Sequence, residues 1–203
     1  MMTRSASKIL SYVLHPLLMP FYAVMLVLNL NTYLSFSISL YVQKLVMTVV
    51  FITTVALPVV TSIFLMQQGF VKSLEMESPQ ERRLPFIAAG IYFLVCYYLL
   101  LMMPVPRVLP NMVLGAASSI FIAWVINFKW KISIHMVGVG GVVGLLIGLS
   151  IRLGAGLWYP VMASVLIAGL LGSARLRLGA HNESQVYAGF ALGVLLEWFF
   201  TTL

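Results

Sequence analysis

The chain lacks aspartate altogether and has few charged residues of either sign. Only 8% of its 203 residues are charged, and every acidic residue is a glutamate. A catalytic triad or proton relay built on Asp is therefore excluded. So few carboxylates also argue against a metal site that needs several of them. We accordingly predict that the protein uses no metal and no cofactor.

Cysteine is almost as scarce, since Cys96 is the only one and lies inside an apolar run. A single cysteine cannot form an internal disulfide and does not make a metal site by itself. The 12 basic residues give a net charge of +7, but they lie at the ends of apolar segments. This placement favours anionic lipid headgroups as partners and argues against nucleic acid.

Hydrophobic residues make up 62% of the chain, and the mean hydropathy is +1.04. A soluble domain of this length has too little interior to hide so much apolar surface. The sequence therefore predicts an all-α integral membrane protein, a bundle of six to seven transmembrane helices that forms a single domain over residues 1–203. The expected location is a bacterial inner membrane, and the oligomeric state is left open.

Seven apolar segments can be read along the chain after an N-terminal segment, residues 1–16, that we expect to lie at the membrane interface. In the second of them, Pro58 is expected to kink the helix. His15 precedes a proline that breaks the N-terminal segment; it could contact a headgroup, but a simple helix break is the favoured interpretation. The predicted spans are 17–30, 40–66, 84–103, 111–126, 132–151, 157–173 and 186–200.

Successive loops between spanning helices must fall on opposite sides of a bilayer. The three charged loops, 67–85, 127–135 and 173–185, are therefore predicted to share one side with the N-terminus. The positive-inside rule would place that side in the cytoplasm. Cations that bind phosphate do not report topology, so the side stays open.

The loop 173–185 holds the densest polar chemistry of the chain, including Arg175, His181 and Gln185. Arginine suits forked recognition of phosphate, and histidine can act as a nucleophile or proton carrier near neutral pH. Ionisable groups beside spanning helices are costly and indicate function. The loop therefore predicts a phosphate-handling site at a membrane surface. A channel or transporter is disfavoured because no ladder of ionisable residues lies in mid-membrane.

The order and spacing of three clusters resemble the type 2 phosphatidic acid phosphatase superfamily of integral-membrane lipid phosphatases. Arg175, His181 and Gln185 keep the spacing of that family's third signature, with Gln185 in the place of Asp. The run from Ser133 to His135 keeps the Ser and His of the second signature. Arg82-Arg83-Leu84-Pro85 is similar to the end of the first signature, without its Lys. The resemblance covers about residues 67 to 203.

The resemblance implies a hydrolase that acts on lipid phosphates or diphosphates, such as an isoprenoid carrier lipid or phosphatidylglycerol phosphate, through a phosphohistidine. His181 would be the nucleophile, and His135 the acid that protonates the leaving oxygen. Gln185 would orient His181. The phosphate would be held by basic and hydroxyl side chains, namely Arg175, Arg83, Arg82 and Ser133. Fixed cations stabilise the charge that spreads over the equatorial oxygens in phosphoryl transfer.

Gln185 is the main departure from the family pattern. Its carbonyl can accept the imidazole N–H of His181, but it cannot supply the negative charge of the family's Asp. Glu183 and Glu81 are other possible partners of His181. The alternative function is therefore a catalytically impaired family member that binds or transports phosphorylated lipid.

Two further features of the sequence are the glycines of the fifth span and a glutamate on the last span. The glycines of the fifth span, from Gly138 to Gly148, are expected to serve helix packing. Glu197 on the last span could tie helices together or belong to a conduction path.

Overall fold

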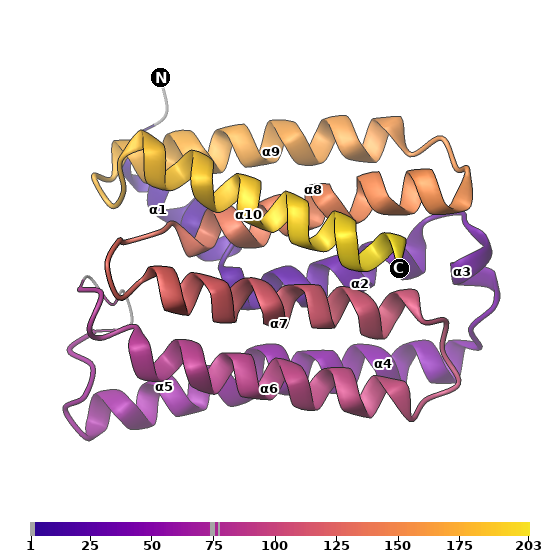
Figure 1. Cartoon of the computed structure of the whole chain (residues 1–203), viewed down its shortest axis with the longest axis horizontal. Helices are drawn as coiled ribbons and strands as arrows, with labels where there is room; N and C mark the ends of the chain where they lie inside the picture. Colours follow the sequence, from indigo (N-terminus) through magenta and orange to yellow (C-terminus); the bar gives the residue numbers. More distant parts are fainter. Residues whose placement is uncertain (1–2, 74–75, 77) are drawn as a thin grey trace.

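The computed structural model describes residues 3–73, 76 and 78–203, and every regular element in these ranges is a helix. Figure 1 shows the long helices running side by side along one axis, with the C-terminus at the end opposite the N-terminus. The elements are α1 (Arg4–Val13), the 3₁₀ turn η1 (Pro16–Leu18), α2 (Met19–Asn29), α3 (Tyr33–Phe36), α4 (Leu40–Phe51), the π-helical turn η2 (Ile52–Ala56), α5 (Leu57–Gln67), α6 (Arg83–Leu101), α7 (Val108–Ile126), α8 (Ile134–Leu153), α9 (Trp158–Arg177) and α10 (Glu183–Thr202).

Six helical segments of the described chain are long and apolar enough to cross a bilayer: Arg4–Asn29, Leu40–Gln67, Arg83–Leu101, Val108–Ile126, Ile134–Leu153 and Trp158–Arg177. The first differs from the predicted span 17–30, because α1, η1 and α2 together supply the length. Helix α10 is also 20 residues long, yet it is not among the six. Its first turn carries Glu183 and Gln185, which lower its apolar character.

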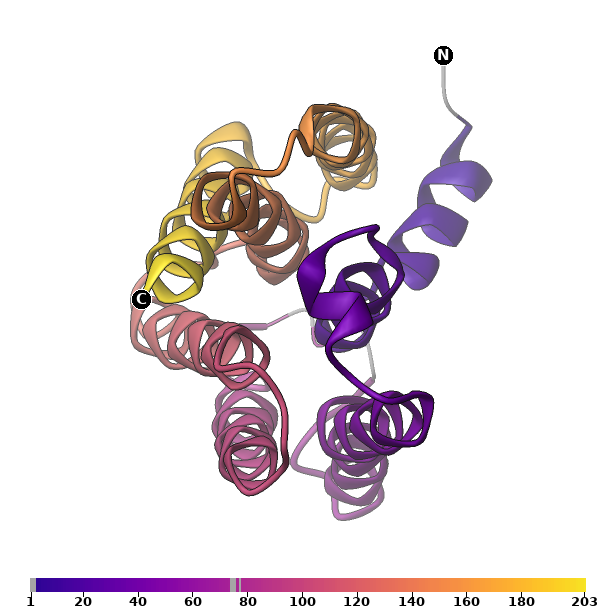
Figure 2. The ribbon, with the colours of Figure 1, turned by 90° about the vertical axis from the view of Figure 1, so that its right-hand side faces the viewer.

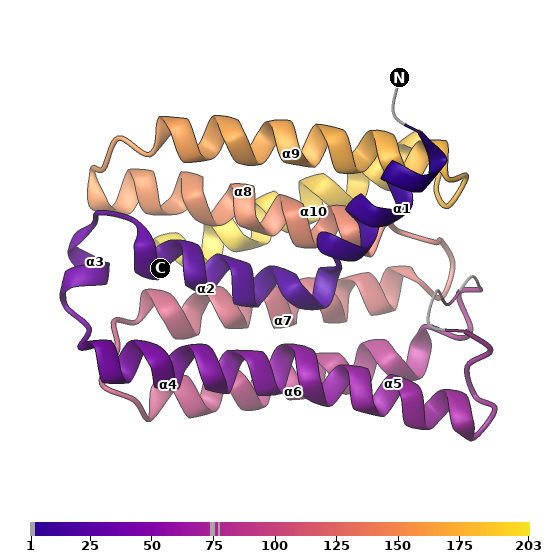
Figure 3. The ribbon, with the colours of Figure 1, turned by 180° about the vertical axis from the view of Figure 1, so that it is seen from behind.

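The N-terminal helix α1 lies obliquely across the loop end of the bundle, next to α9 (Figure 3). Thr3 caps it by accepting the Ala6 N–H at 3.2 Å. The chain then turns at His15 and Pro16, where η1 begins. This break sends α2 into the bundle and leaves α1 at its edge.

The second long segment is not a plain kinked helix. It contains the π turn η2 between α4 and α5, and Pro58 follows two residues after that turn. Proline removes one backbone donor from a helix interior and clashes with the preceding turn. The wider π turn accommodates this disturbance, since the Leu57 N–H reaches back five residues to the Ile52 carbonyl.

Helices α8 and α10 pack backbone to backbone through glycines. A β-carbon added at Gly144 would lie 2.2 Å from the Val194 carbonyl oxygen, and one added at Gly193 would lie 2.1 Å from the Val137 carbonyl oxygen. No other residue fits at these two positions without moving a helix. The prediction that the glycines of residues 138–148 serve packing is confirmed.

The three loops predicted to share one side do lie at one end of the bundle. The segments between α5 and α6, between α7 and α8, and between α9 and α10 are all at the left in Figure 1, with α1. The opposite end carries α3 and the turns after α6 and α8. Leu74, Glu75 and Glu77 of the first loop lie outside the described residues.

Figure 2 looks along the bundle from the end that carries α3. The largest core cluster joins α2, α4, α6, α7 and α8, with Val24, Val46, Leu100 and Leu149 among its members. Large apolar side chains also cover the outer faces: Leu166 of α9 is 70% exposed and Leu195 of α10 is 60% exposed. An outer surface of this kind is unusual for a protein surrounded by water.

Candidate functional site

One cavity of about 1060 Å³ opens among the helices at the loop end. All three histidines of the chain line it. Its basic and imidazole groups come from α1, from the segments before α2 and α6, from the loop before α8 and the first turn of α8, from the last turn of α9 and from the loop before α10; they are Arg4, Lys8, His15, Arg82, Lys131, His135, Arg175 and His181. Away from this charged end the lining is apolar and includes Phe93, Val113 and Leu145.

His181 is held by two oxygen acceptors on the same ring nitrogen. Its Nδ1 lies 3.1 Å from the Gln185 side-chain oxygen and 3.3 Å from the Lys131 backbone oxygen. Because both partners are acceptors, Nδ1 carries the proton and donates. The lone pair of the neutral ring is then on Nε2, which is the form a nucleophile needs.

Gln185 is fixed by the start of α10. Asn182 and Gln185 form a capping box: the Asn182 side chain accepts the Gln185 N–H at 3.0 Å, and the Gln185 side chain accepts the Asn182 N–H at 3.2 Å. The same Gln185 oxygen therefore serves the helix cap and the imidazole. The family resemblance implied this contact between Gln185 and His181.

The electrostatics keep His181 neutral. Burial, followed by the positive charge of Arg82, lowers the pKa of His181 to about 4; Arg175 and Lys131 act in the same direction, while the hydrogen bond to Gln185 opposes them. The side chain is 7% exposed. At pH 7 the imidazole is thus uncharged and sits among three cations.

Arg82 lies just before α6 and is 6% exposed. Its Nε donates to the Met76 carbonyl at 2.8 Å, and its Nη1 has no hydrogen-bond partner among the described residues. Burial, together with the nearby charge of Arg175, lowers the pKa of Arg82 to about 10. A buried guanidinium with unused donors in a cavity is suited to an anion.

The two arginines at the end of α9 have different surroundings. Arg175 lines the cavity and is half-buried, whereas Arg177 is exposed and is not among the residues that line it. The helix period explains the difference, because residues two apart in a helix lie on nearly opposite faces. The resemblance to the family's third signature singled out Arg175, and the structure brings this residue together with His181 and Arg82.

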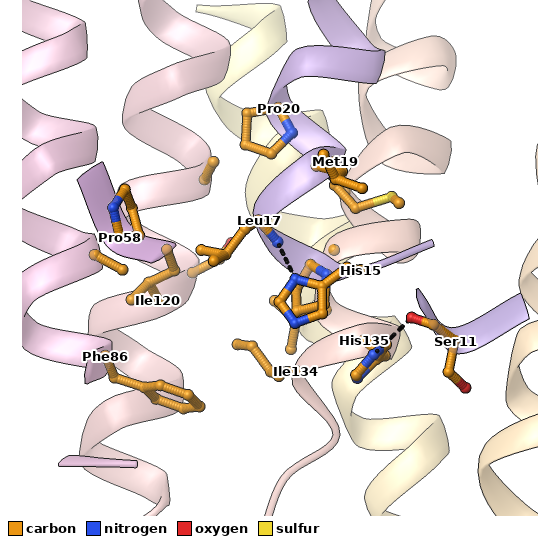
Figure 4. Close-up of a pocket in the computed structure, with 18 of the residues that line it drawn as sticks. Ser11, His15, Leu17, Met19, Pro20, Pro58, Phe86, Ile120, Ile134 and His135 are labelled. Atoms are coloured by element: carbon orange, nitrogen blue, oxygen red, sulfur yellow. Dashed lines mark hydrogen bonds between the residues drawn. The ribbon is translucent and has the colours of Figure 1, made fainter. Parts of the chain in front are cut away.

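His135 lines the cavity from the first turn of α8. Its Nε2 lies 3.2 Å from the Ser11 carbonyl oxygen, so this nitrogen donates and Nδ1 is the free one (Figure 4). The contact ties α1 to α8. His135 and His181 both line the cavity, an arrangement that the resemblance implies.

His15 is the residue that the sequence led us to undervalue. Its ring meets that of His135 edge to face, with centroids 5.6 Å apart (Figure 4). Its Nδ1 accepts the Leu17 N–H at 3.3 Å, so Nε2 carries the proton of the neutral ring. His15 can therefore donate a hydrogen bond to a ligand. Proximity to another histidine 120 positions away could not be read from the sequence.

Two of the predicted phosphate ligands do not line the cavity. The guanidinium of Arg83 stacks on the Phe128 ring at 4.5 Å, and its carbonyl accepts the Trp124 N–H. Ser133 is fully buried, and its backbone N–H donates to the Gln185 carbonyl at 3.3 Å. Both residues position the loops around the site.

The two glutamates considered as partners of His181 are engaged or placed elsewhere. Glu81 accepts a hydrogen bond from the Ser78 hydroxyl at 3.0 Å. Glu183 is exposed in the first turn of α10, where a negative charge suits the helix dipole. Among the described residues, Gln185 is the side chain that bonds the His181 ring.

Lys131 and two basic residues of α1 also line the cavity, although the sequence did not single them out as phosphate ligands. Arg4 and Lys8 are one helical turn apart, so they share a face of α1. That periodicity was a usable signal, because Ser11 and Tyr12 continue the same face.

The apolar part of the cavity is lined from several helices. Figure 4 shows Leu17, Pro58, Phe86 and Ile120 on the side away from Ser11. The lining continues past Val113 of α7 to Leu145 of α8. The arrangement can hold an anionic group at one end and a hydrocarbon chain along the other.

The chain matches no protein-family model, no curated protein and no solved structure in the comparisons made.

Proposed function

We propose that this protein spans a membrane and hydrolyses the phosphate ester or diphosphate of a membrane lipid through a phosphohistidine. The observation that carries the proposal is that one cavity joins a cluster of cations and histidines to an apolar passage. A phosphorylated lipid has the matching two parts. This is also the activity that the resemblance to the type 2 phosphatidic acid phosphatases implies.

Membrane insertion is supported by the outer surface. Six helical segments have the required length and composition, and exposed apolar residues such as Leu166 and Leu195 cover outward faces. In lipid such side chains cost nothing, whereas in water they would favour aggregation. The charged end of the cavity would lie at the headgroup level.

Phosphate binding would use Arg175 and Arg82, with Lys131 nearby. Burial strengthens their attraction for an anion, since the surroundings screen charge less than water does. The cations also favour the transition state, in which charge spreads over the oxygens of the transferring group. Two arginines are preorganised for this task, because helix ends and loops fix them before a ligand arrives.

The reaction would begin with attack of His181 Nε2 on phosphorus. The N–P bond forms as the bond from phosphorus to the lipid oxygen breaks, and His135 Nδ1 passes to that oxygen a proton taken from the monoprotonated phosphate. Neutral His135 then takes a proton from water, whose oxygen attacks the phosphohistidine and releases inorganic phosphate. The released phosphate takes that proton from His135, so His181 and His135 both end in their starting forms.

A second candidate function is binding or transport of phosphorylated lipid without hydrolysis. The hydrogen bond from His181 to Gln185 favours it, because a neutral amide does not stabilise the cationic imidazole of a phosphohistidine as a carboxylate does. Replacing the corresponding Asp by Asn in serine proteases lowers the rate about 10⁴-fold. The two functions share the same cavity and the same cations.

The deciding experiment measures phosphate release by the purified protein in detergent micelles, with EDTA present, from a panel of lipid phosphates and diphosphates. Release that disappears in His181→Ala, together with acid-labile labelling of the wild type by ³²P substrate, supports hydrolysis through His181. Release that persists in His181→Ala contradicts the mechanism.

The second function gives a different result in the same assay. No lipid would be hydrolysed, but lipid phosphate would bind, and Arg175→Ala would weaken that binding while Arg177→Ala would not. Absence of both hydrolysis and binding across the panel rules out both functions.

A further inference from the structure

A buried carboxyl group, Glu197 of α10, lines the apolar part of the cavity. The residue is 6% exposed, and its Oε2 has no hydrogen-bond partner among the described residues. Unpartnered polar groups are costly in apolar surroundings. Neither the charged end nor the phosphoryl-transfer chemistry uses this group.

The helices around Glu197 leave room for it. A β-carbon added at Gly115 of α7 would lie 2.9 Å from Glu197 Oε2, and one added at Gly141 of α8 would lie 3.1 Å from Glu197 Cγ. Glycine at both positions lets the carboxyl reach between α7 and α8. The side chain is thus seated where only the smallest residue gives it space.

A second unpartnered polar group lines the same cavity. Ser119 of α7 is 3% exposed, and its hydroxyl has no partner among the described residues. It lies one helical turn from Gly115 on the same face of α7. The Glu197 carboxyl and the Ser119 hydroxyl are therefore both available to hydrogen-bond a ligand in a part of the cavity that is otherwise apolar.

We propose that Glu197 and Ser119 form a subsite for the ester carbonyls of a glycerol-based lipid phosphate, a proposal that rests on the function given above. The distance of this subsite from the charged end is comparable with the dimensions of such a lipid. Gly141 is six residues beyond His135 in α8, an axial distance of about 9 Å. An ester carbonyl oxygen of such a lipid is six bonds from phosphorus, a reach of roughly 7 Å at ordinary bond lengths.

The chemistry of the pair also selects the lipid. An isolated ionised carboxylate is far more costly in apolar surroundings than the neutral acid, so Glu197 offers an O–H donor to a carbonyl, as Ser119 does. An isoprenoid or alkyl phosphate has no group to accept these hydrogens and would leave both donors unpaired. Sites that expect a hydrogen-bonding group discriminate against ligands without one.

The test compares two lipid phosphates that differ only in the carbonyls: dioctanoylglycerol phosphate and its dioctyl ether analogue. The ratio of their kcat/KM values is measured in detergent, or the ratio of their Kd values if the protein binds without hydrolysis. We expect the wild type to favour the diester about tenfold, the effect of one or two hydrogen bonds.

Variants assign the preference to the subsite. Glu197→Leu should bring the ratio close to one, Glu197→Gln should keep most of it because the amide still donates, and Ser119→Ala should lower it about threefold. Glu183→Gln, at the exposed start of the same helix, should leave the ratio unchanged. Ser119→Ala keeps the inference testable if Glu197→Leu does not fold.

Equal use of diester and diether by the wild type would overturn the inference and leave the proposed function standing. So would an unchanged preference in both Glu197→Leu and Ser119→Ala. If neither lipid is bound or hydrolysed, the subsite fails, and the panel of lipid phosphates and diphosphates described above decides separately whether the proposed function stands.

Discussion

The two ends of the cavity are built in opposite ways. At the charged end, loops and helix termini far apart in sequence bring together Arg82, Arg175 and His181. At the apolar end, the interiors of long helices supply side chains such as Val113 and Leu145, and the packing of α8 on α10 is fixed by glycine.

Under the proposed function, the charged end would recognise the lipid headgroup and the apolar end its hydrocarbon chain. Charged groups act through direction and distance, so single atoms matter at the charged end. The apolar end acts through area and volume, so its effect accumulates over many contacts. Substitutions at the two ends should therefore differ both in size and in dependence on the ligand.

The largest effect is expected for Arg175→Ala compared with Arg177→Ala. A hydrogen bond to a charged group contributes about 1.5–3 kcal/mol, so loss of Arg175 should lower kcat/KM or affinity for lipid phosphate about 100-fold. Arg177 is exposed outside the cavity and should change either value less than about twofold. Equal losses in the two variants would show that charge alone, rather than placement in the cavity, matters.

The next effect is a gain from Gln185→Glu. Glutamate has nearly the same shape, suits the same capping box, and puts a negative charge beside His181 Nδ1, where the present distance to Gln185 is 3.1 Å. If the protein is a hydrolase, stabilisation of the imidazolium should raise the rate of phosphate release about tenfold or more. Asn182→Asp, which also alters the cap but not the His181 contact, is the control; an equal gain there would contradict the explanation.

At the apolar end, Val113→Phe should shorten the usable passage. Each methylene kept out of an apolar site costs about 0.8 kcal/mol, close to a fourfold loss of affinity. The affinity for long-chain lipid phosphates should therefore fall with each added methylene, while short-chain ones should bind as tightly as they do to the wild type. Val125→Phe, on an exposed face of the same helix, should have no effect. A uniform loss at every chain length would mean that the substitution disturbs the charged end.

The smallest effect concerns pH. Because the pKa of His181 is about 4, below its ordinary value of about 6.5, the ring stays neutral as pH falls from 7 to 5. The rate of deuterium exchange at its imidazole C2, followed by mass spectrometry, should show a midpoint near 4. Gln185→Glu should move that midpoint upward, because a neighbouring negative charge favours the protonated ring. A midpoint near 6.5 in the wild type would mean that neither burial nor the nearby cations act on the pKa of His181.

Much of the fold could be predicted because its determinants are local. Runs of apolar residues marked the long helices, and the alternation of loops placed the three charged segments at one end. The site was predictable where the contact is local as well: Arg175, His181 and Gln185 are within ten residues, and the α9–α10 turn brings them together.

The rest depended on contacts between distant segments. Arg82 and Arg83 are adjacent and have the same charge, yet Arg82 lines the cavity while the guanidinium of Arg83 stacks on Phe128, 45 positions along the chain. The meeting of His15 with His135 requires α1 to fold back over the start of α8, through the bond to the Ser11 carbonyl. No local pattern encodes that return.

The π turn η2 has a consequence for how this cavity can change over evolutionary time. Val55 within the turn, and Pro58 and Val59 just beyond it, line the apolar passage. A π turn holds about one residue more than an α-helical turn. Loss of one residue from 52–56 would let the turn close to an ordinary α-helical one and would leave α5 facing the cavity with the same side chains as before. Loss of one residue elsewhere in α4 or α5 would instead rotate the following part of the helix by about 100°. The π turn is therefore the part of this wall where a single-codon deletion keeps the row of side chains that α5 shows to a ligand.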